Sequence, residues 1–80
     1  MTFDLAALQE LVGKLRSDDP PEIDNPDMPL EDYGLDSLDL SGIFLELERR
    51  YSLVIEDEDM ERLTTARRII DFVAARAVAA

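Results

Sequence analysis

The feature that most constrains the fold is the placement of apolar residues at helical spacing on both sides of one proline-rich segment. All four prolines lie between Pro20 and Pro29. Because proline breaks a helix interior, no helix can continue through this segment. Elsewhere the chain shows none of the apolar and polar alternation that indicates β-strands. The sequence therefore predicts helices before and after one long loop.

Two long helices are expected on either side of that loop. The first covers about residues 3–16 and ends near Ser17, since apolar residues recur there at helical spacing: Leu5, Leu8, Val12 and Leu15. The second runs from Ser37 to about Tyr51. At about 100° of rotation per residue, its apolar residues fall within roughly 60° of Leu40 and form one stripe: Ile43, Phe44, Leu47 and Tyr51.

The C-terminal third predicts a short helix and a last long one. Glu56 or Asp57 caps the short segment, which extends through Arg62, and Thr65 caps the last helix. That helix has one apolar face: Ala66, Ile69, Ile70, Val73 and Ala77. The expected fold is all-α, a small antiparallel bundle of three main helices plus a short third helix, with the long loop after the first helix. We expect partial order in that loop, pinned by its apolar residues: Ile23, Met28 and Leu30.

Composition limits the chemistry of the chain. Its 80 residues are expected to form one domain (1–80), and 8 lysines and arginines against 19 acids give a net charge of −11. This charge disfavours nucleic-acid binding and favours partners with basic surfaces. The absence of histidine and cysteine removes the usual general base, thiol nucleophile and Cys/His zinc ligands. Without a leader in Met1–Asp4 or a run long enough for a membrane span, we expect a cytoplasmic protein. Met1 and the compact ends favour a freestanding chain, and the high charge without a large exposed apolar stripe favours a monomer.

One serine stands at the expected start of the second helix. Asp36 is placed as the N-cap, Asp39 as the capping-box acid three residues later, and Ser37 as the first helical residue. The backbone N–H groups and the helix dipole there favour a negative group, such as a phosphate ester, on the serine oxygen. Cap preferences alone favour a simpler interpretation, in which Ser37 only helps to cap the helix.

The hexapeptide Gly34-Leu35-Asp36-Ser37-Leu38-Asp39 resembles the attachment site of acyl carrier proteins. The likeness extends over about residues 30–74 and begins upstream with Leu30-Glu31-Asp32-Tyr33. Downstream, further segments follow the order and spacing of that family without a gap: Leu47-Glu48, Tyr51, Val54-Ile55-Glu56-Asp57-Glu58, Glu61-Arg62-Leu63-Thr64-Thr65 and Ile70-Asp71-Phe72-Val73.

This resemblance implies a carrier that is not itself an enzyme. In that family a phosphopantetheinyl transferase uses coenzyme A and Mg²⁺ to attach a 4'-phosphopantetheine arm to the serine, here Ser37. The thiol of the arm then holds acyl intermediates as thioesters for an acyltransferase, a ketosynthase or other pathway enzymes. Asp36 is implied to cap the helix and to meet the cations of the transferase. Tethering raises the effective concentration of the cargo at each partner.

Partner recognition is expected around the start of the second helix. Leu38 and Leu45 lie at roughly 140° to 160° from Leu40 on the helical rotation, so we expect them to be exposed and to form a docking strip. The other recognition candidates are polar residues or glycine: Asp39, Ser41, Gly42, Glu48, Glu56 and Asp57. The acids among them would steer a basic partner surface.

Four apolar residues have two interpretations. By their spacing they belong to the core, and the resemblance adds a candidate acyl pocket that they would border: Leu40, Phe44, Leu63 and Ile69. Phe44 is larger than the aliphatic residue common at its place in the family. We therefore expect less room for a long acyl chain beside it.

Departures from the fatty-acid carrier pattern favour a specialised pathway such as polyketide assembly. Gly42 stands where an acid is common, and Ser41 stands where an apolar residue is common. Arg49-Arg50 replaces further acids. A peptidyl or aryl carrier of nonribosomal peptide synthesis is an alternative, although Gly34-Leu35-Asp36 differs from its usual Gly-Gly-His/Asp-Ser pattern. An acidic helical interaction module, which needs no modification, is another. The ligand spacing of an EF-hand calcium site is absent.

Overall fold

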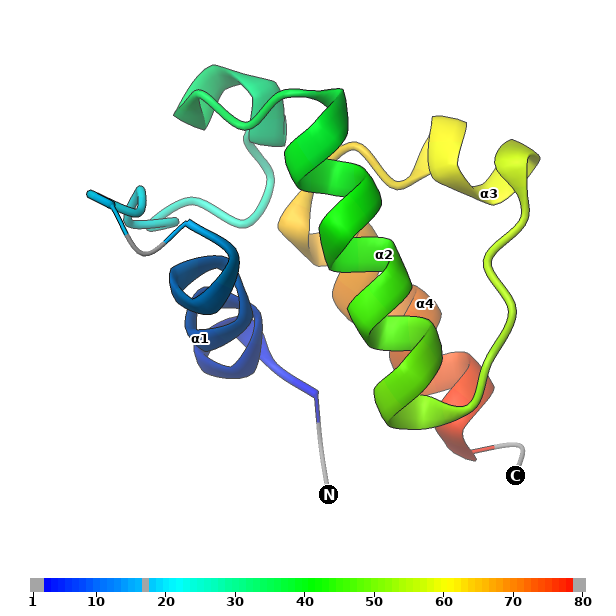
Figure 1. The fold of residues 1–80 in the computed structure, drawn as a ribbon. Helices are drawn as coiled ribbons and strands as arrows, with labels where there is room; N and C mark the ends of the chain where they lie inside the picture. The colour runs from blue at the N-terminus through cyan, green and yellow to red at the C-terminus, as the bar shows by residue number, and fades with distance from the viewer. Residues whose placement is uncertain (1–2, 17, 79–80) are drawn as a thin grey trace.

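The computed structural model describes residues 3–16 and 18–78. Its elements, in chain order, are α1 (Leu5–Leu15), the 3₁₀ helix η1 (Leu30–Tyr33), α2 (Ser37–Tyr51), α3 (Asp57–Arg62) and α4 (Ala66–Val78). Helices α1, α2 and α4 pack against one another, and α3 lies on the side of α2 away from α1 (Figure 1). Within these two ranges the structure contains no strand, only an isolated β-bridge between Pro29 and Thr65. The predicted all-α fold with a short third helix is confirmed.

The core is formed largely by one face of each long helix, as the sequence predicts, with two differences. Leu40, Tyr51 and Ile70 of the predicted stripes are only half-buried, and Leu11, which was not predicted, is fully buried. Three residues from each long helix are buried: Leu8, Leu11 and Val12 from α1, Ile43, Phe44 and Leu47 from α2, and Ala66, Ile69 and Val73 from α4. Each large apolar side chain among them stabilises the fold by about 1.5 to 3 kcal/mol through its removal from water. The side chain of Ala77 lies outside the described residues.

Leu15 fits the helical spacing that predicts the first helix, but it is not buried. Its side chain is 42% exposed, whereas Leu11 is fully buried. Leu15 is the last residue of α1 and lies over the surface of α2 at Gly42, where its Cδ1 atom would be 3.4 Å from an added Cβ. It therefore covers the edge of the contact between α1 and α2.

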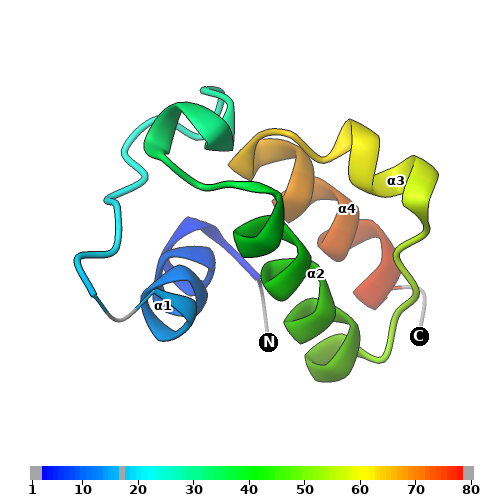
Figure 2. The ribbon, with the colours of Figure 1, turned by 45° about the horizontal axis from the view of Figure 1, so that its top comes forward.

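The loop between α1 and α2 crosses the end of the bundle at which α2 begins (Figure 2). Ile23 and Leu30 are buried and Met28 is half-buried, so the expected pinning of the loop is confirmed. Gln9 of α1, which no pattern in the sequence indicates, holds the loop through both the oxygen and the nitrogen of its side-chain amide. Its Nε2 donates to the carbonyl oxygen of Pro21 and its Oε1 accepts from the N–H of Ile23, each at 2.7 Å.

The second half of the loop is attached to the start of α4. The N–H of Leu30 donates to the carbonyl oxygen of Thr64 at 2.8 Å, and the N–H of Arg67 donates to that of Pro26 at 2.9 Å. The guanidinium of Arg67 also pairs with Asp27 and lowers the pKa of its carboxyl. These contacts fix the segment that leads into η1 and α2.

No helix in the described ranges is long and apolar enough to cross a membrane.

Candidate functional site

The site begins at the first residue of α2, where Ser37 is exposed. Asp36 precedes it with extended backbone angles and accepts a hydrogen bond from the N–H of Asp39 at 2.9 Å. Asp39 in turn accepts from the N–H of Asp36 at 3.0 Å. The predicted capping box is thus confirmed, and its two carboxylates cap the helix start. The hydroxyl of Ser37 lies at an exposed helix start that the two neighbouring acids already cap.

The capping box is joined to α1 by Arg16. Its Nη1 lies 3.7 Å from Oδ2 of Asp39 and donates to the carbonyl oxygen of Gly34 at 2.9 Å. The hydrogen bond from the N–H of Asp39 is the main cause that lowers the pKa of the Asp36 carboxyl, and the charge of Arg16 acts in the same direction. Gly34 itself ends η1 with φ of 87°, a conformation that favours glycine. The turn before Ser37 therefore has a fixed shape.

An apolar groove opens beside Ser37, between α2 and α3. Its volume is about 240 Å³, and its lining combines predicted and unpredicted residues: Ser37, Leu40, Ser41, Phe44, Met60 and Glu61. The structure thus brings Leu40 and Phe44 to the serine, as a pocket for an acyl chain requires. Met60 was missed, although it is the one apolar residue in the sequence of α3. The groove has a concave shape and an apolar lining, which suit an apolar chain attached at its rim.

Two of the four candidate pocket residues lie elsewhere. Leu63 is buried, and its exposed edge lines a different cavity, between α3 and α4. Ile69 is fully buried in the core. In this structure neither of them lines the groove beside Ser37.

The predicted docking strip is exposed on the outer face of α2. Leu38 is 81% and Leu45 is 58% exposed, as their helical positions predict, and Ser41 is also exposed. Gly42 is half-buried beneath Leu15. The surface of α2 at Gly42 is therefore covered by α1 of the same chain.

The acidic candidates differ in what they contact. Glu48 is half-buried, and its Oε2 accepts a hydrogen bond from the N–H of Ile55 at 3.0 Å, which holds the segment between α2 and α3. Glu56 and Asp57 are exposed at the start of α3, where Asp59 accepts from the N–H of Glu56 at 3.1 Å. The structure thus gives Glu48 a structural contact, makes Glu56 the exposed N-cap residue of α3, as predicted, and leaves Asp57 exposed in its first turn.

Comparison with known proteins agrees with this geometry. A family model described as "Phosphopantetheine attachment site" matches residues 6–73. The acyl carrier protein of an Exiguobacterium species is 32% identical over 69 residues, which cover 86% of this chain and 87% of that relative. The chain belongs to the acyl carrier proteins.

Two further acyl carrier proteins resemble the chain at similar levels. That of Rubrobacter xylanophilus is 33% identical over 69 residues, covering 86% of this chain and 85% of the relative. A solution NMR structure of butyryl-ACP from the actinorhodin polyketide synthase of Streptomyces coelicolor superposes with a TM-score of 0.79. It is 27% identical in sequence and matches 96% of this chain and 94% of that one.

Membership of the acyl carrier proteins establishes the general role of the chain. It carries acyl groups on 4'-phosphopantetheine, it is a carrier and not a catalyst, and it interacts with a phosphopantetheinyl transferase and with the enzymes of its pathway. The structure fits that cofactor, because an exposed hydroxyl stands at a helix N-terminus beside an apolar groove.

Proposed function

We propose that Ser37 is the residue that carries the phosphopantetheine arm. The observation that supports this assignment is its place at the exposed start of α2, at the rim of the groove that Leu40, Phe44 and Met60 line. The helix dipole favours a phosphodiester at this position. The nearby carboxylates of Asp36 and Asp39 oppose its charge, so their contribution is to fix the first turn of α2 and to meet the cations of the transferase.

The residues of this chain have two tasks once the arm is attached. Asp36, Asp39 and Arg16 hold the attachment point at a fixed place on the surface. Leu40, Phe44 and Met60 offer apolar surface to a short acyl chain. The arm supplies the thiol that forms the thioester, which a chain without cysteine cannot supply itself.

Partner enzymes are proposed to dock on the outer face of α2. Leu38 and Leu45 provide exposed apolar contacts, with Ser41 between them and Leu15 at the edge beside Gly42. The exposed acids of the neighbouring segment flank this strip: Glu56, Asp57, Glu58 and Glu61. A suitable partner has an apolar pocket bordered by lysines and arginines, so its encounter with the carrier is accelerated by charge and weakened by salt.

We propose a polyketide-type pathway for the cargo. The likeness to the actinorhodin carrier supports this choice, as do Ser41, Gly42 and Arg49-Arg50, which depart from the fatty-acid pattern on the docking helix. A peptidyl carrier role predicts aminoacyl loading instead. Incubation of the modified chain with acyltransferases and with aminoacyl-activating enzymes separates the two, since only acyl loading agrees with the proposal.

The attachment residue is tested by intact mass after incubation with coenzyme A, Mg²⁺ and a phosphopantetheinyl transferase. The wild type should gain the mass of one arm, and Ser37→Ala should gain none. Ser41→Ala is the matched control, because Ser41 is a second exposed serine one turn later that lines the same groove. Full modification of Ser37→Ala, or loss of modification in Ser41→Ala alone, would overturn the assignment.

A further inference from the structure

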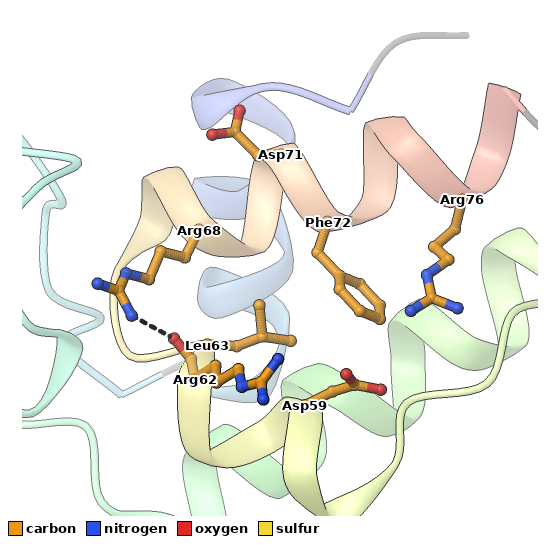
Figure 3. A pocket seen from close by; sticks show the side chains of 7 residues that line it. All are labelled: Asp59, Arg62, Leu63, Arg68, Asp71, Phe72 and Arg76. Carbon is orange, nitrogen blue, oxygen red and sulfur yellow. Dashed lines mark hydrogen bonds between the residues drawn. The ribbon is translucent and has the colours of Figure 1, made fainter.

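A second cavity lies between α3 and α4, separate from the groove beside Ser37. Its volume is about 410 Å³, and arginines dominate its lining: Asp59, Arg62, Leu63, Arg68, Asp71, Phe72 and Arg76. None of these residues lines the groove beside Ser37, which lies between α3 and α2. Figure 3 shows Arg68 at one end of the cavity and Arg62 and Arg76 towards the other end, beside Leu63 and Phe72. The carboxylate of Asp59 lies between Arg62 and Arg76, and that of Asp71 is turned away. We call this cavity the α3–α4 groove.

The arginines of the α3–α4 groove differ from the other arginines of the chain. Four arginines lie within 4.0 Å of a carboxylate: Arg16, Arg49, Arg50 and Arg67. In the described ranges, Arg62, Arg68 and Arg76 form no such ion pair. The lining of the α3–α4 groove therefore holds three guanidinium groups that form no ion pair, against the two carboxylates of Asp59 and Asp71, in a chain whose net charge is −11. Such a local excess of positive charge attracts anions.

Two of these guanidinium groups are held in place by contacts that leave most of their donors available. Arg68 donates from Nη1 to the carbonyl oxygen of Arg62 at 3.2 Å. The guanidinium carbon of Arg76 lies 4.5 Å from the centroid of the Phe72 ring, a cation–π contact that uses no N–H group. A guanidinium has five N–H donors in a planar fork that matches carboxylate and phosphate. Both arginines are thus positioned before any anion arrives.

The floor of the α3–α4 groove is apolar. Leu63 is buried and Phe72 is half-buried, and both line the cavity. The carboxylate of Asp59 accepts a hydrogen bond from the N–H of Glu56, so part of its hydrogen-bonding capacity is used within α3. An occupant that matches this lining needs a charged end for the arginines and an apolar body for Leu63 and Phe72.

We propose that the α3–α4 groove binds a ligand in which a carboxylate or phosphate is joined to an apolar chain or ring. The negative group pairs with Arg68, and the apolar part lies on Leu63 and Phe72 towards Arg76. The ligand is either a free amphipathic anion or acyl cargo that ends in a carboxylate. Binding of acyl cargo rests on the proposed function of Ser37, whereas binding of a free anion does not.

The first experiment uses the unmodified chain and so does not depend on Ser37. Octanoate is titrated into ¹⁵N-labelled protein, with octanamide as the uncharged probe of the same chain length. We expect saturable shifts for the backbone amides around residues 62–76 with octanoate, weaker binding at higher salt, and no saturable shifts with octanamide. Equal binding of both probes overturns the proposal. The absence of a saturable shift with octanoate excludes a free anion as the ligand and leaves only acyl cargo, which the second experiment tests.

Variants in which one arginine is replaced by uncharged glutamine test whether the arginines of the groove bind the anion. Arg68→Gln should weaken octanoate binding by about tenfold, the effect of one charge-assisted hydrogen bond. Arg49→Gln removes one positive charge from α2, outside the groove, and should leave the affinity unchanged. An identical loss in both variants points to net charge alone and contradicts the site. The amide spectrum of each variant reports whether the fold is intact.

The second experiment identifies the source of the anion. The modified chain is loaded with a glutaryl arm, which ends in a carboxylate, or with a butyryl arm, which does not. Shifts at residues 62–76 in the glutaryl form alone, abolished by Arg68→Gln, assign the groove to cargo. Octanoate binding without such shifts supports the site with a free anion as its ligand. Absence of both effects overturns the proposal.

Discussion

Arg16, the residue that follows α1, donates from its guanidinium to the carbonyl oxygen of Gly34 at 2.9 Å. Gly34 opens the hexapeptide that carries Ser37, so this bond joins the end of the first helix to the start of the site. The same Nη1 atom lies 3.7 Å from Asp39 in the capping box. One side chain, distant in sequence, therefore helps to set the position of the attachment serine.

Replacing Arg16 by glutamine should loosen this segment. We expect the free energy of unfolding to fall by about 1 kcal/mol, the net value of one hydrogen bond, because the exposed ion pair adds little. The transferase should also modify Arg16→Gln more slowly than the wild type. Urea unfolding and the rate of mass gain measure the two effects. Arg49→Gln is the control, since Arg49 is exposed and pairs with Glu46 on its own helix. Equal effects in both variants would contradict the role of Arg16.

The capping carboxylate of Asp36 predicts a pH dependence of stability. Hydrogen bonding lowers the pKa of Asp36 in the folded state below the unfolded value of about 3.9. Its contribution is therefore present above that pH and is lost as the pH falls through the lower folded pKa. Asp36→Asn retains a good N-cap residue but does not titrate.

This effect is tested by measuring the urea midpoints of the wild type and Asp36→Asn from about pH 6 to about pH 2, a range that includes the reference pKa of an aspartate. The stability advantage of the wild type should shrink as the solution becomes acidic. Asp32→Asn changes the net charge equally at another exposed position, so it reports the general relief of repulsion in this acidic chain. A constant difference between wild type and Asp36→Asn at every pH would refute the prediction.

Gln9 should be important for the order of the long loop. Gln9→Ala removes hydrogen bonds to both Pro21 and Ile23 and leaves those part-buried backbone groups without these partners. We expect a loss of about 2 kcal/mol in unfolding free energy, within the range for buried polar groups that lose a partner. Amide hydrogen exchange at Ile23 should also become faster. The neighbouring exposed change Glu10→Ala should have little effect, and unchanged exchange at Ile23 in Gln9→Ala would contradict the prediction.

Two substitutions at Gly42 separate its effect on stability from its effect on partner recognition. An added Cβ would lie 3.4 Å and 3.6 Å from the Leu15 methyl groups, which is ordinary contact. Gly42→Ala should therefore stabilise the chain by about 1 kcal/mol through helix propensity. Gly42→Glu is larger and must displace Leu15, so it should change which ketosynthases accept the carrier. Turnover with a panel of partner enzymes measures this, and an unchanged order of preference would refute it.

Phe44 should limit how deeply an acyl chain enters the groove beside Ser37. Phe44→Leu costs about 1 kcal/mol of stability as a moderate change of core volume, and it opens space next to Leu40. On octanoyl-loaded protein, we expect hydroxylamine to cleave the thioester more slowly in Phe44→Leu than in the wild type. Leu45→Ala, on the exposed face of α2, serves as control. An eight-carbon chain fully enclosed beside Phe44 in the wild type would contradict the prediction.

The sequence alone determined the local structure. The apolar stripe of α2, the Asp36 and Asp39 capping box and the hydroxyl of Thr65, which accepts from the N–H of Arg68 at 3.2 Å, all lie where helical spacing places them. These features depend on residues three to four positions apart. Such separations are fixed by helix geometry before any packing occurs.

Only the tertiary structure decided which distant residues meet. It placed Leu15 over Gly42, gave Glu48 to the N–H of Ile55, and separated Leu63 and Ile69 from the groove beside Ser37. It also gathered three arginines from two elements into the α3–α4 groove. Periodicity states which face of a helix is apolar, but the partner of that face depends on how the helices pack and where the loops cross. Those relationships arise from contacts between segments far apart in the chain, which no local pattern encodes.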